Sequence, residues 1–450
     1  MSNNQKIGKK VVNPLSAGSI IQIACEMLKY INKQILFHNE RTAFIALNIA
    51  RHMGLGKEYS LQNLVILSLF HTIGFFRDDT FFSYSASEDK IDYFTKDHFI
   101  ESKYVFSCYY LEFMTPLKQD ALALEIFFQP YNKDMEKYIY QEKIKSILYF
   151  SARISDYIYR NPDSPLPEDL NSIEPGQFNP LVVQSFQQIN HNNSIINQIK
   201  AKTHLNFLYN YVSKITLSDK DKNCYLKLVT YLLDFKSTST MTHSINTSCY
   251  ALALGMRFNL SQDDISQLFI SSMLHDIGKI CTPQKILEAP GKLSPEEMGI
   301  MRYHVNHSKK ILTDLVPENI LEDVYRHHEK LNGNGYPNHL TEAELSLIQR
   351  IITIADITSA LSDSRSYKGE FSVEETFTIM QKMTDNGELD KNIISVLFNQ
   401  YDSIMEDLRF FQKTLQADFS QIFMRYNDFV FNDIEPLVDA VEVIDTVEYI

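Results

Sequence analysis

The chain has 450 residues, more than one hydrophobic core usually serves, so we expect two or three domains and take two as the starting hypothesis. With 44% hydrophobic and 22% charged residues, the composition is that of a globular protein and excludes extensive disorder. The net charge of −13 opposes general attraction to a nucleic-acid polymer or an anionic membrane surface, so local cations must hold any phosphate ligand.

The five cysteines are scattered and none lies in a CxxC spacing, which indicates neither a disulfide framework nor a thiolate zinc site. The amino-terminal residues do not form a convincing secretion signal, and no run reaches the roughly 18 apolar residues of a membrane span. We therefore expect a cytoplasmic protein with no membrane partner.

Apolar residues recur at intervals of three and four through most of the chain, and alternating β-branched segments are scarce, so we predict an all-α fold. The segment 261–280 shows this most clearly, because Ser261 and Asp264 form a capping-box pattern before an apolar helical face. Stretches rich in proline or glycine predict loops at 160–180, 289–295 and 332–337.

Six matches in the same order relate the first half of the chain to the second. His38 is followed 33 residues later by His71 in FHTIGF, and His243 is followed 32 residues later by His275 in LHDIGK. The other four pair His98 with His304, 126–129 with 326–329, 148–158 with 351–361, and 176–183 with 387–394. The order favours a duplication. We predict two tandem helical bundles, at 1–200 and 201–450, the second with a carboxy-terminal helical tail.

The first copy is expected to keep the fold and to lack the chemistry. It retains His38, His71 and His98, but the alignment places Thr72, Phe75, Phe127, Phe128 and Arg153 where the second copy has potential ligands and a lysine. Apolar rings would fill the former pocket and Arg153 would repel a cation. A single metal held by three histidines is one alternative. A sensor for an unknown ligand, a packing partner and a homodimer surface are the others.

The second copy gathers residue types that bind metals. His275 and Asp276 are adjacent, which suits a carboxylate that bridges two ions. Lys279 follows His275 by one helical turn. The remaining candidates are His243, His304, the pair His327 and His328, and Asp356 within an apolar helix. Imidazole and carboxylate together suit first-row transition metals better than calcium or magnesium.

The complete ordered set resembles one protein family. It consists of His243, HDIGK at 275–279, His304, HHE at 327–329, NGNGYP at 332–337, Asp356, and RSYK at 365–368. Over about residues 236–400 it is similar to the HD-GYP subgroup of the HD phosphohydrolase superfamily. The resemblance implies an all-α bundle that hydrolyses cyclic di-GMP or a related cyclic dinucleotide in bacterial signalling, with two divalent metal ions, iron or manganese.

The resemblance also assigns roles to individual residues. One metal would be held by His243, His275, Asp276 and Asp356, and the other by Asp276, His304, His327 and His328. Asp276 and Lys279 would be the catalytic pair. Substrate would contact Lys279, Gly335, Tyr336, Pro337, Arg365 and Lys368.

Four positions depart from the family pattern. Ser239 stands where members with a third metal have glutamate, so we expect two metals. Asn332 replaces the usual aspartate of the glycine-rich loop, Ser359 replaces a second aspartate after Asp356, and Ser366 replaces a proline. These changes bear on hydrogen bonds around the ligands and on substrate preference. His307 stands at a usually apolar position and is expected to be solvated or to lie behind the ligands.

The resulting hypothesis is a metal-dependent phosphodiesterase for cyclic di-GMP. An enzyme specific for 3′,3′-cyclic GMP-AMP is the nearest alternative, because base preference depends on loop contacts that the sequence does not locate. A receptor that binds a cyclic dinucleotide without turnover belongs to another class, as does a protein-interaction scaffold. The complete ligand set favours an enzyme, since a receptor need not keep both Asp276 and Lys279.

Overall fold

The computed structural model describes residues 13–57, 60–77, 98–133, 140–233, 240–289, 291–362 and 371–416. In these segments the secondary structure is helical, apart from one isolated β-bridge between Asn332 and Thr341. The predicted all-α fold is therefore confirmed. No helix in the described segments is long and apolar enough to cross a lipid bilayer.

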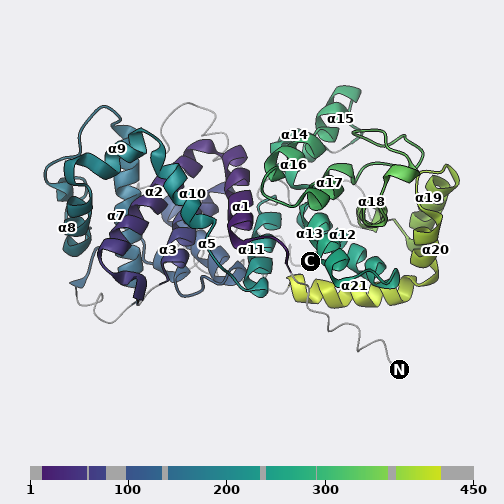
Figure 1. The fold of residues 1–450 in the computed structure, drawn as a ribbon, viewed down its shortest axis with the longest axis horizontal. Coiled ribbons are helices and arrows are strands. Elements are labelled where there is room, and N and C mark those ends of the chain that lie inside the picture. Colours follow the sequence, from purple (N-terminus) through teal and green to yellow (C-terminus); the bar gives the residue numbers. More distant parts are fainter. Residues whose placement is uncertain are drawn as a thin grey trace, which may run out of the picture.

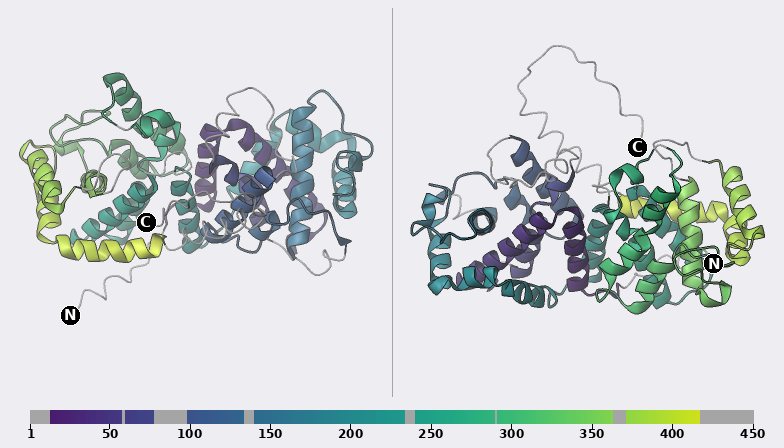
Figure 2. Two further views of the ribbon diagram at one scale, coloured as in Figure 1. Left: turned by 180° about the vertical axis from the view of Figure 1, so that it is seen from behind. Right: turned by 90° about the horizontal axis from the view of Figure 1, so that it is seen from above.

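The helices form two bodies that lie side by side along the long axis of the molecule (Figure 1). The first contains α1 (Ala17–Ile31), α2 (Lys33–His52), α3 (Leu61–Phe70), η3 (Ile73–Arg77), α5 (His98–Met114), η4 (Ala121–Leu124), α7 (Tyr140–Arg160), α8 (Pro180–Ile189), α9 (Ser194–Lys200) and α10 (Thr203–Val212). Views from behind and from above show the same side-by-side arrangement (Figure 2).

The second body comprises the later helices of the chain. It contains α12 (Thr240–Arg257), α13 (Gln262–Leu274), η7 (Ile277–Cys281), α14 (Gln284–Leu287), α15 (Pro295–Arg302), α16 (His304–Leu312), α17 (Glu318–Arg326), α18 (Leu347–Ser362), α19 (Val373–Asp385), α20 (Lys391–Asn399) and α21 (Tyr401–Gln416). At its centre α12 packs against α13 and α18, as α2 packs against α3 and α7 in the first body.

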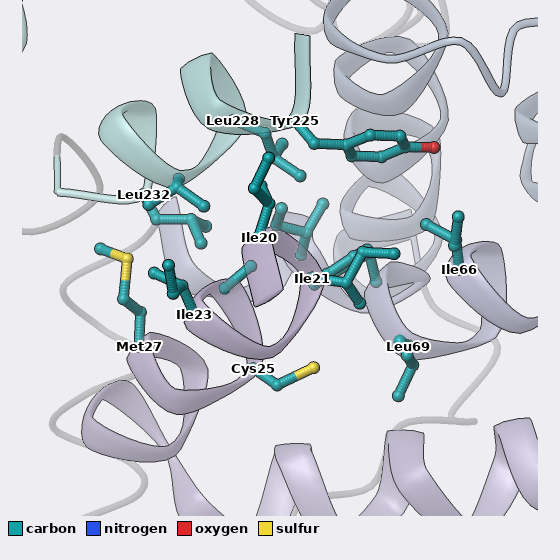
Figure 3. Close-up of a cluster of buried hydrophobic side chains, with 14 of the residues drawn as sticks. Ile20, Ile21, Ile23, Cys25, Met27, Ile66, Leu69, Tyr225, Leu228 and Leu232 are labelled. Atoms are coloured by element: carbon teal, nitrogen blue, oxygen red, sulfur yellow. The ribbon is translucent and has the colours of Figure 1, made fainter. Parts of the chain in front are cut away.

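The two bodies meet through α1 and α11 (Asp219–Tyr231), which pack against each other. Figure 3 shows this contact, with Leu228 and Leu232 of α11 near Ile20 and Ile23 of α1. The same helix α1 also packs against η7 and α16 of the second body. The first body therefore reaches the elements that carry the candidate site.

Equivalent hydrogen bonds support the predicted duplication at the level of single atoms. In the first body Ser155 Oγ lies 3.2 Å from His38 Nδ1 and donates to the His38 carbonyl at 3.1 Å. In the second body Ser359 Oγ lies 3.1 Å from His243 Nδ1 and donates to the His243 carbonyl at 3.2 Å. In the first body a serine of α7 therefore fixes a histidine of α2, and in the second body a serine of α18 fixes a histidine of α12.

These bonds correct the predicted position of Arg153. Ser155 and Ser359 are equivalent, so the residue three positions earlier, Ala152, corresponds to Asp356. Arg153 instead turns to the side, where its Nε lies 2.7 Å from a carboxylate oxygen of Glu174. The alignment from sequence was one residue out of register, because the apolar pattern of the two helices matches almost equally well at either register.

A second pair of contacts corrects the match between His98 and His304. The Gly74 amide donates to Ser107 Oγ at 2.9 Å, and the Gly278 amide donates to Ser308 Oγ at 2.8 Å. Counting back from each serine, Lys103 corresponds to His304. A Cβ on Gly74 would lie 2.1 Å from the Lys103 carbonyl, and a Cβ on Gly278 would lie 2.0 Å from the His304 carbonyl, so glycine is required at both places. The side chain of His98 lies outside the described residues.

The helix predicted over 261–280 is shorter than expected. The predicted capping box of Ser261 and Asp264 is present, but α13 ends at Leu274. Asp276 leaves the helical conformation with φ −96° and ψ 5°, and a 3₁₀ turn begins at Ile277. The tight approach of Gly278 to α16 imposes this turn, since a continuous helix could not bring Gly278 to Ser308. His275 and Asp276 consequently sit at a helix end.

Candidate metal centre

Five elements bring the seven predicted ligands together. His243 lies on α12, His275 and Asp276 lie between α13 and η7, and His304 begins α16. The pair His327 and His328 follows the last residue of α17, and Asp356 lies in the middle of α18. All except His328 are buried. Residues spread over more than 100 positions of the chain thus form a single cluster.

Asp276 is central to this cluster, because its two carboxylate oxygens face different histidines. Oδ2 lies 3.2 Å from His275 Nε2 and 3.6 Å from His243 Nε2. Oδ1 lies 3.4 Å from His304 Nε2 and 3.8 Å from His327 Nε2. Each oxygen therefore shares a space with one pair of imidazole nitrogens, which is the arrangement that a bridging carboxylate requires.

Asp356 closes one side of the cluster. Its Oδ1 lies 2.9 Å from His243 Nε2 and 3.8 Å from His275 Nε2, and its Oδ2 lies 3.6 Å from His328 Nδ1. The structure therefore places Asp356 with His243 and His275, as the sequence predicts for one of the two ligand sets. His328 lies between Asp356 and the other set.

The histidine rings are oriented by hydrogen bonds on the side away from Asp276. His275, His304 and His327 each place Nδ1 against the backbone carbonyl three residues earlier, at 2.7, 2.8 and 2.6 Å. His243 uses Ser359 instead. A proton on Nδ1 leaves Nε2 as the lone-pair donor, which fixes the tautomer needed to bind a cation.

Burial keeps three of the imidazoles, those of His304, His327 and His328, neutral. It lowers the pKa of His304 to about 4 and that of His328 to about 3, and it also lowers the pKa of His327. Neutral imidazole is the form that binds metals. For the carboxylates, burial acts to raise the pKa of Asp276 and Asp356, but the surrounding histidines, and Lys279 beside Asp276, outweigh it and hold both pKa values low. Anionic carboxylates therefore face the neutral imidazoles of these three histidines.

The residues fit divalent metal ions. Their ligand atoms form two groups whose members lie within 4.8 Å of one another, namely Asp276 with His304, His327 and His328, and Asp276 with His243 and His275. His275 Nε2 and Asp276 Oδ1 are buried without a hydrogen-bond partner. Buried polar atoms are rarely left unpaired, so these two atoms point to a ligand that the protein itself does not supply. The nitrogen and oxygen donors suit first-row metals.

Lys279 lies at the edge of the cluster. Its Nζ is 2.5 Å from Asp276 Oδ2, and its side chain is 20% exposed. The 3₁₀ turn that begins at Ile277 brings the lysine back over Asp276. The ammonium group therefore combines contact with the central carboxylate and access to solvent, as a group that meets substrate requires.

The loop 332–337 packs tightly beside the histidine pair. A Cβ on Gly335 would lie 2.4 Å from the Glu329 Cα, so only glycine allows this approach. The buried Glu329 carboxylate accepts the amides of Asn338 and Leu340 at 2.6 and 3.0 Å, and this anchors the far end of the loop. Pro337 follows Tyr336 through a cis peptide bond. Glu329 thus has a structural function that the sequence interpretation did not assign.

Asn332 shows what the departure from the family pattern does locally. Its side-chain oxygen accepts the Asn334 amide at 3.1 Å, which an aspartate could also do. Its side-chain nitrogen donates to the Asn386 carbonyl at 3.0 Å, which an aspartate could not do. The change therefore ties the loop to the segment between α19 and α20.

Tyr336 presents an aromatic surface at the rim of the cluster. Its ring centroid lies 4.8 Å from that of His328, and the guanidinium of Arg302, a residue of α15, lies 5.2 Å from the Tyr336 centroid. Sequence interpretation missed Arg302, whose only signal is its place two residues before His304. The predicted substrate contacts Arg365 and Lys368, and also Ser366 and Ser239, lie outside the described residues.

His307 does not join the cluster. Its ring meets that of Tyr303 edge to face at 5.0 Å, and both line a surface pocket of about 340 Å³ beside α15.

The corresponding space in the first body is filled by aromatic rings. Phe127 stacks on Tyr104 at 4.4 Å and lies 6.2 Å from His71. Thr72, at the position of Asp276, exchanges hydrogen bonds with Asn39. Among the described residues, the groups of three or more metal-binding side chains occur in the second body alone.

Comparison with known proteins agrees with this geometry. Residues 227–393 match the family model described as HD domain. The second body therefore contains a domain of the HD phosphohydrolase superfamily, and the predicted resemblance is confirmed. The match covers the whole cluster from His243 to Asp356.

Curated relatives carry related names. A 3′3′-cGAMP-specific phosphodiesterase 1 of Vibrio cholerae is 34% identical over 38% of this chain and 40% of its own length. The 3′3′-cGAMP-specific phosphodiesterase 3 of the same organism is 32% identical over 46% of this chain and 45% of its own length. A cyclic di-GMP phosphodiesterase of Pseudomonas aeruginosa is 30% identical over 34% and 37%. The chain thus matches less than half of the length of these relatives.

One solved structure resembles nearly the whole chain. The crystal structure of a cyclic GMP-AMP-specific phosphodiesterase from Vibrio cholerae covers 86% of this chain and 98% of its own, with a TM-score of 0.52 and 18% identity. At this identity the likeness concerns the fold alone. It extends through the first body and supports two helical bundles in tandem.

Proposed function

We propose that the chain is a metal-dependent phosphodiesterase that hydrolyses a cyclic dinucleotide in cytoplasmic bacterial signalling. The observation that carries the proposal is the geometry of Asp276, whose two oxygens face separate histidine pairs at 3.2 to 3.8 Å. The names of the relatives support the substrate class. The seven ligands would hold two divalent ions, iron or manganese, in the two sets that the sequence predicts.

Such ions supply Lewis-acid chemistry: they lower the pKa of water and stabilise charge on phosphate oxygens. The protein contributes the rest. Asp276 keeps its negative charge between the two histidine pairs, and the Nδ1 hydrogen bonds fix the rings before substrate arrives. Preorganised groups of this kind act without rearrangement during the reaction.

Lys279 and Tyr336 would act on the substrate. In hydrolysis water adds to phosphorus, the bond from phosphorus to the ribose oxygen breaks, and that oxygen takes up a proton. Lys279 Nζ, paired with Asp276 and partly exposed, can hold a non-bridging phosphate oxygen or deliver this proton. Tyr336, with Arg302 beside its ring, offers a surface on which a base can stack. Gly335 and Pro337 would shape this stacking surface.

Cyclic di-GMP is the substrate that we propose first, and 3′,3′-cyclic GMP-AMP is the alternative. The names of the two Vibrio cholerae relatives favour the alternative. Because no described contact distinguishes a guanine from an adenine base, the turnover of the two substrates measured side by side is the deciding measurement.

For the first body, residues 1–200 in the predicted division, we propose a regulatory or sensory function without catalysis. Its central space is packed with Phe127 and Tyr104. Beyond residue 200, α10 still packs against α1 and α2. A homodimer formed through this body remains part of the proposal.

The test is turnover by protein loaded anaerobically with iron or manganese. We expect linear dinucleotide from both substrates, at rates that differ and so name the preferred one, and no product after metal removal by a chelator. Saturable binding of both dinucleotides with no product from either would refute the enzyme and support the receptor. Absence of both binding and product would refute the substrate class.

A further inference from the structure

Asp323 is a buried carboxylate of α17 that lies outside the cluster around Asp276. Its residue surface is 1% exposed. Its Oδ2 accepts hydrogen bonds from Gln267 Nε2 at 2.7 Å and from Ser271 Oγ at 3.1 Å. Its Oδ1 accepts a hydrogen bond from Gln349 Nε2 at 3.1 Å. One carboxylate therefore joins α17 to both α13 and α18.

The three joined helices are those that deliver ligands from both predicted sets. Ser271 precedes His275 by four residues, and Asp323 precedes His327 by four residues. Gln349 precedes Asp356 by seven residues. Residues four or seven apart share a helix face, so each hydrogen-bonding group lies one or two turns before a ligand on the same face of its helix.

A carboxylate is a costly way to hold helices together. Burying a charge is unfavourable, and apolar side chains of similar volume often give equal or better stability. Apolar contacts, however, have no preferred direction, whereas three hydrogen bonds fix the separation and rotation of the helices. This hydrogen-bonded arrangement restrains geometry where geometry determines metal binding.

We propose that Asp323 is a positioning residue that sets the spacing between His275, His327 and Asp356 for metal binding. The proposal rests on the proposed function, which makes these three residues metal ligands. Asp323 itself touches neither metal nor substrate; it acts through α13, α17 and α18.

The first body provides a matched control. Its buried Asp120 accepts hydrogen bonds from Asn63 of α3 at 2.8 Å and from Tyr140 of α7 at 2.5 Å. These helices correspond to α13 and α18, but the space that they surround is filled by Phe127 and Tyr104. Asp120 is therefore a comparable carboxylate link between helices with no metal to position.

The experiment compares Asp323→Asn with Asp120→Asn in the full chain. Mn²⁺ binding is measured from the loss of the free-ion signal in electron paramagnetic resonance, and kcat and KM are measured with cyclic di-GMP and cyclic GMP-AMP. Asn keeps the volume of Asp but replaces one acceptor by a donor that faces other donors. We expect the Mn²⁺ dissociation constant of Asp323→Asn to rise about tenfold, with a lower kcat and an unchanged KM. Asp120→Asn should match the parent in all three values.

Ser271→Ala provides a milder variant, because it removes one donor to Asp323 and leaves the carboxylate in place. It should weaken Mn²⁺ binding in the same direction and by less. If Asp323→Asn loses its circular dichroism signal for helix, Ser271→Ala alone decides, and Mn²⁺ binding equal to that of the parent would then overturn the proposal.

Two further outcomes overturn it. In one, Asp323→Asn binds Mn²⁺ as tightly as the parent does. In the other, Asp120→Asn weakens binding as much as Asp323→Asn, which would make both links general supports of the fold. If the parent binds Mn²⁺ but cleaves neither dinucleotide, the proposed function fails, and the binding comparison still decides whether Asp323 positions the ligands.

Discussion

The two bodies of this chain share a backbone framework and differ in what occupies its centre. In both, one serine fixes one histidine across the central helix pair, and one glycine amide donates to a serine of the next helix. In the second body, carboxylates and imidazoles face one another there. In the first, aromatic rings stack in the same place.

This difference teaches which parts of the pattern belong to the fold and which to the chemistry. The Ser155–His38 bond and the glycine contact persist in the first body, whose described residues form no ligand cluster, so they serve packing and orientation of helices. Asp276 and the imidazole at His327 have no counterpart, because Thr72 and Phe127 stand in their places. Asp276 and His327, which the first body lacks, therefore distinguish the two centres better than His243 and His275, which it retains as His38 and His71.

The largest expected effect separates Asp276 from its counterpart Thr72. Asp276→Ala should lower turnover by more than about 1000-fold, because both predicted metals lose a ligand and Lys279 loses its anion. Thr72→Ala removes the hydrogen bonds to Asn39 and should leave turnover of the full chain unchanged. Steady-state rates at saturating metal and circular dichroism of both variants make the measurement. Equal losses in the two would mean that the first body also takes part in catalysis.

A smaller effect should distinguish the two centres, namely the free energy of unfolding that is lost when one central side chain is removed. Phe127→Ala should lower the free energy of unfolding by about 3–5 kcal/mol, because it empties a packed aromatic site. His327→Ala should cost less in metal-free protein, since it also removes the desolvation cost of a buried imidazole. Urea unfolding of both variants without metal tests the order. A greater cost for His327→Ala would show that the polar cluster is well packed without metal.

The pH dependence of stability should report Asp323. Burial raises its pKa from 3.8 to about 6, while hydrogen bonds from Gln267, Ser271 and Gln349 and the charge of Arg326 on its own helix act to lower it. The folded state thus binds the proton more tightly than the unfolded state does. This stabilisation is complete below pH 3.8 and is lost as the pH rises through about 6.

At about 1.4 kcal/mol for each pH unit between the two pKa values, the loss amounts to about 3 kcal/mol. Asp323→Asn lacks the titrating group, so from pH 4 to pH 7 the metal-free variant should gain about this much relative to the parent. Urea unfolding at the two pH values provides the measurement. Parallel changes in parent and variant would mean that Asp323 titrates near its ordinary value in the folded protein.

The sequence sufficed for the fold class and the capping box of α13, and it named the seven residues that the structure brings together, whose function as ligands stays a prediction. These depend on local helical spacing or on residue types that rarely occur together, and both are visible in the chain itself. The sequence did not give the correct register between the helix that contains Arg153 and its counterpart in the second body. The two helices carry runs of mostly apolar residues at 147–150 and 351–355, so apolar residues still pair with apolar ones after a shift by one position, and only the contact of Ser155 with His38 reveals the shift.

Contacts of polar side chains with residues far away in the sequence could not be predicted either. Arg302 meets Tyr336 from 34 positions away, and Gln349 meets Asp323 from 26 positions away. Nothing in the residues around either partner predicts the pairing, because helix packing sets it. The end of α13 at Leu274 was missed for a related reason, since the contact of Gly278 with His304 lies outside the helix itself.

The smallest effect tests where the two bodies should behave alike. Gly176 precedes α8 with φ +76°, and Gly387 precedes α20 with φ +70°. Three positions after each glycine stands the cap residue of the helix. Asn179 accepts the Leu181 amide, and Asp390 accepts the Asn392 amide. No atom lies within 4 Å of a Cβ built on Gly176, and at Gly387 the nearest is 3.8 Å away, so the cost of alanine comes from the backbone conformation alone. Each glycine-to-alanine change should therefore destabilise by about 1 kcal/mol, with turnover unchanged. Urea unfolding and steady-state rates test both variants. A clear difference between the two losses of stability would show that the two turns, unlike the helices that follow them, are not structurally equivalent.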